Sequence, residues 1–91
     1  MHIYMKKFGT FLNGRSEGRE AALRLFQILG SEDKDGQDIV LDFEGVEIMT
    51  PSFADEMLRR ANERYAGQKE IKIINTDTEV IRYVIKFVSE K

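Results

Sequence analysis

Ser52 is the residue whose type and position most directly suggest chemistry. It lies in the stretch IMTPSFADEML, residues 48–58, where Thr50 is a suitable N-cap and Pro51 suits the first position of a helix. Ser52 would then be the second helical residue, beside backbone N–H groups at the positive end of the helix dipole. A phosphate there would meet hydrogen-bond donors already in place. The sequence therefore leaves two interpretations of Ser52: a residue that only helps to cap a helix, or a phosphorylation switch.

The residues that most often carry catalysis are sparse. The chain has no cysteine, which excludes disulfides, zinc–thiolate sites and thiol nucleophiles. Its one histidine, His2, we expect to be an exposed residue at the chain start, so a histidine-based triad has no credible member. The sequence contains neither a Walker A loop nor a Rossmann glycine fingerprint. We expect no enzymatic activity, no catalytic residue and no cofactor.

Acidic residues gather in two places. Residues 31–38, SEDKDGQD, read as an exposed loop whose spacing does not match the calcium-loop pattern, so we expect no metal there. The second group consists of Asp42, Glu44, Glu47, Asp55 and Glu56. Paired carboxylates support acid–base catalysis only in a cleft that separates their environments, so we expect a solvated rim instead. For Asp42 we expect a structural role, either orienting the next loop or marking the end of its strand.

Length and composition indicate one small globular domain. The chain has 91 residues, 42% of them apolar and 33% charged, which fits a single domain over residues 1–91. A core of this size is modest, so oligomerisation would help it to stay folded. No apolar run approaches the roughly 18 residues of a membrane span, and the N-terminus lacks the features of a signal peptide. We expect a cytoplasmic protein that does not bind membranes.

The charge pattern argues against nucleic-acid binding. The formal charge is −2, and no stretch forms a basic footprint. Arg59, Arg60 and Arg64 cluster on a predicted helix, but Glu56 and Glu63 interleave with them. We expect a solvated, salt-bridged helix face rather than a phosphate-binding patch.

Three apolar segments are predicted as strands that support the Ser52 region. Residues 38–43, DIVLDF, contain a continuous apolar run, which is typical of a strand covered on both faces. Residues 70–75 and residues 2–8 are predicted as the other two strands. Glycine and asparagine punctuate residues 9–18, which we interpret as a turn-rich connection.

Three helices are predicted between and after the strands. The first spans residues 16–29, with Ser16 as its cap and Gly30 at its end. The second begins at Pro51, stops at Gly67 and presents one apolar stripe. The stripe consists of Phe53, Ala54, Met57, Leu58, Ala61 and Tyr65. Residues 76–78 cap the third helix. The order β-α-β-α-β-α predicts a small α/β layer with helices packed on a mainly parallel sheet.

The stretch VLDFEGVEIMTPSFADEML, residues 40–58, resembles the strand–loop–helix core of STAS domains, the fold of bacterial anti-sigma-factor antagonists. Its LDF strand, its Gly-Val step and its SFADE run are similar to the uncharacterised STAS-like group of that fold. The NGR at residues 13–15 and the helix after it also fit this group. The resemblance spans most of the chain and is distinctive in these central residues.

In the antagonists, a partner that is both an ATP-dependent kinase and an anti-sigma factor phosphorylates the second hydroxyl residue of an Asp-Ser-Ser motif. The unphosphorylated form binds that partner, and phosphate breaks the complex. By position, the resemblance assigns this role to Ser52. This sequence departs from the antagonists' motif at three positions: Thr50 replaces the aspartate, Pro51 the first serine and Phe53 the glycine. The fold and the docking of a partner therefore carry over better than phosphorylation does.

The leading hypothesis is a non-enzymatic regulatory protein-interaction module that docks a partner, such as an ATPase-type kinase, through residues 50–56. The candidate partner-binding residues are Thr50, Pro51, Phe53, Asp55 and Glu56, with Ser52 as the candidate phosphorylation site. Two alternatives stay open. One is a structural module that homodimerises without phosphorylation, and the other is a STAS-like domain that senses a small ligand.

Overall fold

Three short parallel strands form the main sheet of the computed structural model, which describes residues 2–31, 38–65, 70–76 and 78–89. The strands are β1 (His2–Tyr4), β3 (Ile39–Asp42) and β5 (Ile71–Ile74), in the order β1-β3-β5. Tyr4 lies opposite Asp42, which lies opposite Ile74, so the three carboxyl ends meet at one edge. The strands predicted at 38–43 and 70–75 are confirmed.

The N-terminal strand is shorter than the sequence predicts. It ends at Tyr4, and residues Met5–Phe8 form a 3₁₀ helix, η1, that buries Met5 completely. Gly9 closes this turn with φ 126°, a left-handed region that favours glycine, and its N–H donates to the Lys6 carbonyl. The prediction of a strand over residues 2–8 is therefore wrong after Tyr4, because the chain turns to bury Met5.

A second, two-stranded parallel sheet lies within the segments expected to be connections. It pairs β2 (Phe11–Leu12) with β4 (Ile48–Met49). Leu12 and Met49 are opposite one another and buried, whereas Phe11 and Ile48 are opposite one another and exposed. The sequence prediction missed β2, since two residues carry no detectable periodicity.

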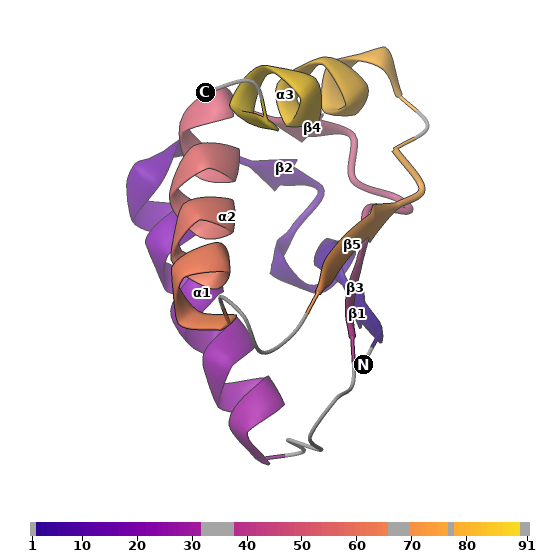
Figure 1. Cartoon of the computed structure of the whole chain (residues 1–91). Helices are drawn as coiled ribbons and strands as arrows, with labels where there is room; N and C mark the ends of the chain where they lie inside the picture. Colours follow the sequence, from indigo (N-terminus) through magenta and orange to yellow (C-terminus); the bar gives the residue numbers. More distant parts are fainter. Residues whose placement is uncertain (1, 32–37, 66–69, 77, 90–91) are drawn as a thin grey trace.

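The three helices are α1 (Gly14–Ser31), α2 (Pro51–Tyr65) and α3 (Glu79–Ser89). Figure 1 shows α1 and α2 side by side on one side of the sheet, starting at the same end, with α3 crossing that end. α3 packs against α2 and β4, and the Thr78 hydroxyl oxygen accepts the Ile81 N–H at 3.2 Å as its cap. The small α/β fold with helices on a mainly parallel sheet is confirmed.

α1 and α2 pack closely against each other at Gly18. A Cβ added there would lie 2.6 Å from the Phe53 carbonyl oxygen, so only glycine fits this crossing. All six residues of the predicted α2 stripe are buried, and they join α1, α3 and the strands in one core. α1 starts at Gly14, two residues before the predicted start, so Ser16 is not its cap. The predicted loop at 31–38 and the helix end at Gly67 lie largely outside the described residues.

Candidate functional site at the starts of α1 and α2

Thr50 connects the starts of the two long helices. Its Oγ1 accepts the Phe53 N–H at 3.3 Å, which caps α2, and also the Gly14 N–H at 2.9 Å, which opens α1. The Thr50 N–H donates to the Leu12 carbonyl at 2.9 Å, so β2 is held at the same point. Thr50 as N-cap and Pro51 as the first residue of α2 are confirmed. Because one hydroxyl serves both helices, the positive ends of two helix dipoles meet here.

Ser52 is the second residue of α2 and is half-buried. Asp55 and Glu56 follow three and four positions later, on the same side of the helix. The predicted position of Ser52 within the helix is confirmed. Its phosphorylation stays a prediction.

An ion-pair network beside Ser52 joins the two helices. The Arg15 Nη1 of α1 lies 2.9 Å from Asp55 Oδ2 and 3.5 Å from Glu56 Oε1. Glu56 also binds Arg59 at 3.1 Å, and Arg60 donates to its second oxygen. These bonds, chiefly the one from Arg60, lower the pKa of Glu56, and the bond to Asp55 raises the pKa of Arg15. The predicted salt-bridged helix face is confirmed for Glu56, Arg59 and Arg60.

Burial corrects the set of residues expected to face a partner. Phe53 is 1% exposed and Glu56 is 6% exposed, so neither side chain presents a surface to a docking protein. Phe53 is part of the core, and Glu56 is covered by the arginines that neutralise it. The remaining candidates, Thr50, Pro51 and Asp55, are exposed or half-buried.

Three residues that the sequence did not single out lie next to these candidates. Phe11 and Ile48, 55% and 41% exposed, form the outward pair of the β2–β4 sheet, each three positions before a helix start. Arg15 contributes the guanidinium that bridges α1 and α2. The only sequence signal for Phe11 and Ile48 was an apolar residue in each short connection before a helix, and Arg15 lies in the NGR of the family resemblance. We define the helix-start surface as Phe11, Arg15, Ile48, Pro51, Ser52 and Asp55.

Asp42 ties together the carboxyl ends of the main-sheet strands. It is 2% exposed, and its Oδ1 accepts the Glu44 N–H and the Asn75 side-chain amide, each at 2.9 Å. Its Oδ2 lies 2.7 Å from His2 Nε2. The bond from Asn75, followed by that from the Glu44 N–H, lowers the pKa of Asp42 despite its burial. Asp42 thus has the structural role expected of it, both tying the strand ends and holding the next loop. The solvated rim predicted for the carboxylates is wrong for Asp42 and Glu56, because both are buried.

His2 is exposed, as the sequence predicted, but it is not a free terminal residue. It belongs to β1, bonds to Asp42 and stacks on Tyr4 with ring centroids 4.5 Å apart. Within the described ranges, no three histidine, cysteine or acidic side chains are placed to hold a metal ion together. In the same part of the chain, no helix combines the length and the apolar character that crossing a membrane requires.

Comparison with known proteins gives a family but no individual relative. Searches of the curated proteins and of the solved structures return no significant match. A family model described as "STAS-like domain of unknown function (DUF4325)" matches residues 21–80, which is more than half of the chain. The match includes β3, β4, α2 and β5, and therefore Ser52. The chain belongs to this STAS-like family.

Proposed function

We propose that the chain is a non-enzymatic regulatory module that binds a protein partner through the helix-start surface. The observation that supports the proposal best is the shared cap. Thr50 Oγ1 brings the N-termini of α1 and α2 together beside Ser52. A half-buried hydroxyl at this point can receive a phosphate while it remains part of a surface that a partner covers.

The composition of the helix-start surface suits a protein partner. Phe11, Ile48 and Pro51 supply exposed apolar area, while the Arg15–Asp55 ion pair supplies charges at its side. Interfaces between proteins commonly combine an apolar centre that includes aromatic residues with a polar rim. The partner in this proposal is an ATPase-type kinase, by the resemblance to the anti-sigma-factor antagonists.

Phosphorylation of Ser52 would act on this surface through Arg15. A phosphate adds roughly −1.5 to −2 charge, one helical turn from Asp55 and Glu56. Arg15 already contacts both carboxylates, and its side chain is 53% exposed, so it has the freedom to turn from Asp55 to the phosphate. The change would remove the Arg15–Asp55 pair from the surface and place a dianion beside the apolar residues. A partner that fits the unmodified surface would then dissociate.

The experiment uses the full chain with a candidate ATPase-type kinase and ATP, followed by mass spectrometry to locate phosphate. We expect phosphate on Ser52, and loss of partner binding in Ser52→Glu but not in Ser52→Ala. Ser16 provides a matched control, because it is an exposed serine in the first turn of α1. Ser16→Glu adds the same charge at the neighbouring helix start and should leave binding intact. If Ser52→Ala, Ser52→Glu and the parent chain bind the partner equally well, Ser52 is not a phosphorylation switch.

A further inference from the structure

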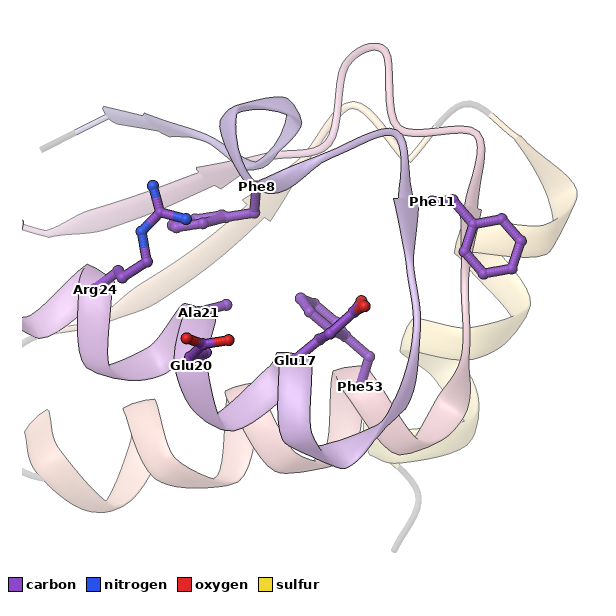
Figure 2. Close-up of a pocket in the computed structure, with 7 residues that line it drawn as sticks. All are labelled: Phe8, Phe11, Glu17, Glu20, Ala21, Arg24 and Phe53. Atoms are coloured by element: carbon purple, nitrogen blue, oxygen red, sulfur yellow. The ribbon is translucent and has the colours of Figure 1, made fainter.

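A pocket of about 170 Å³ lies between η1 and α1, beside the helix-start surface. Figure 2 shows Ala21 and Phe53 at its base, Phe8 with Arg24 at one end, and Glu17 and Glu20 along α1. Phe11 also lines the pocket, but its ring points away from the other labelled side chains (Figure 2). We call this the η1–α1 pocket. It is smaller than the roughly 300–1,000 Å³ of sites for drug-sized ligands, so it suits a single side-chain head group.

The carboxylates of the η1–α1 pocket can accept further hydrogen bonds. Glu17 and Glu20 are three positions apart on α1, which places them on one side of the helix. Glu17 uses Oε2 to accept the Asn13 N–H at 3.0 Å, and Oε1 remains for a ligand. The Glu20 side chain is exposed, and no described residue forms a hydrogen bond or salt bridge with it. Two carboxylates against one guanidinium, that of Arg24, favour a positively charged occupant.

The aromatic side of the pocket already binds a guanidinium. The Arg24 Cζ lies 5.1 Å from the centroid of the Phe8 ring, within the range of cation–π attraction. Phe53 closes the base of the pocket, with 1% of its surface exposed. Because Arg24 already lies over Phe8, an entering cation would face the glutamates rather than the rings.

We propose that the η1–α1 pocket receives an arginine side chain of the protein partner. Arginine fits better than lysine, because its fork of N–H donors can bond to Glu17 and Glu20 together. The partner as the source of this arginine rests on the proposed function. The position of the pocket supports this source. Glu17 accepts the N–H of Asn13, the residue before α1, and Phe53 belongs to the first turn of α2. A chain bound to the helix-start surface would thus reach the pocket directly.

The test needs no partner protein. The ¹⁵N-labelled chain is titrated with the blocked peptide acetyl-Gly-Arg-Gly-amide and, separately, with the same peptide carrying citrulline, a neutral isostere of arginine. We expect saturable amide shifts around Phe8, Glu17, Glu20 and Phe53 with the arginine peptide only. Glu20→Gln should weaken its binding about fivefold, as expected for loss of one exposed charge pair. Added salt should weaken it as well.

Glu79→Gln is the control, since it removes an exposed acid from α3 and should leave the titration unchanged. Equal shifts with the citrulline peptide, or equal affinity in Glu20→Gln, would overturn the proposal. Free arginine binding more tightly than the blocked peptide would overturn the assignment to a partner and indicate a small-molecule ligand. The titration involves neither Ser52 nor the kinase. A negative titration would therefore not contradict the proposed function, and a negative phosphorylation experiment would not contradict arginine binding.

Discussion

Asp42 and Glu56 are both carboxylates with almost no exposed surface, but they are neutralised in different ways. Asp42 receives a side-chain amide, a backbone N–H and a histidine, all of which belong to the strand ends or the loop beside them. Glu56 receives three guanidiniums, and those of Arg15 and Arg59 are about half exposed. The first site is closed except at His2, whose side chain is 44% exposed, whereas the second extends to the surface through two guanidiniums that can change partners. This difference separates the part of the molecule that maintains the fold from the part suited to regulation.

Asp42→Ala tests the closed site and should have the largest effect. It leaves the Asn75 amide and the Glu44 N–H without their acceptor at a buried position, which is costly. We expect the melting temperature to fall by about 15 °C, measured by circular dichroism. Glu44→Ala, an exposed acid two residues along, should change it by less than about 3 °C. Equal effects of the two substitutions would contradict a supporting role for Asp42.

Acid should destabilise the fold, with a smaller effect than Asp42→Ala. Bonds from Asn75 and from Arg60 hold the pKa values of Asp42 and Glu56 below their ordinary values of 3.8 and 4.5. A lowered folded pKa gives stability that is present above the unfolded pKa and lost as pH falls through the folded one. Urea midpoints should therefore be flat near neutral pH and decline below those ordinary values.

Asp42→Asn separates the contributions of the two carboxylates to this decline. It keeps the shape of the side chain but removes one titrating group, so the fall at low pH should be shallower than in the parent chain. A decline of identical steepness would assign the acid sensitivity to other carboxylates.

Thr50→Val tests the shared cap and should have an intermediate effect. It keeps the volume of the side chain but removes the acceptor for the Phe53 and Gly14 N–H groups. We expect a loss of about 1.5 kcal/mol in the free energy of unfolding, measured in urea. Thr50→Ser keeps the hydroxyl and should recover most of that loss. Hydrogen exchange should accelerate at Gly14 as well as at Phe53, and acceleration at Phe53 alone would exclude the shared cap.

Arg15→Gln should have the smallest effect on stability, because exposed ion pairs contribute little. We expect a melting temperature within about 2 °C of the parent. Its effect should appear instead in combination with Ser52→Glu, which we expect to be tolerated with Arg15 and destabilising without it. A double-mutant cycle of melting temperatures measures this coupling. If the two changes in melting temperature are additive, Arg15 takes no part in the proposed switch.

The sequence predicted the elements whose pattern repeats. The β3 run and the α2 stripe each extend over enough residues to show their period, and Thr50 and Pro51 mark a helix start by local rules alone. β2 escaped prediction because it exists only through its pairing with β4, 37 residues away in register. Phe53 was expected both in the buried stripe and at the docking surface, and burial decides for the stripe.

The two ionic sites show the same limit of sequence reasoning. The partners of Asp42 include His2 and Asn75, 40 and 33 positions away, and Glu56 draws Arg15 from 41 positions away. No local pattern brings these residues together, since only the parallel strand order and the Gly18 crossing do so. The pocket beside α1 likewise needs Phe8 and Phe53 from separate elements.

The shared hydroxyl of Thr50 also has a consequence for motion. A residue that caps two helices makes their first turns open and close together, so fraying of one exposes amides of the other. A partner or a phosphate that strains Thr50 would loosen the first turn of α1, where Glu17 lines the neighbouring pocket. Phosphorylation of Ser52 or binding of a partner there would thus change the order of the first turn of α1 through cooperative local unfolding, without any movement of the sheet.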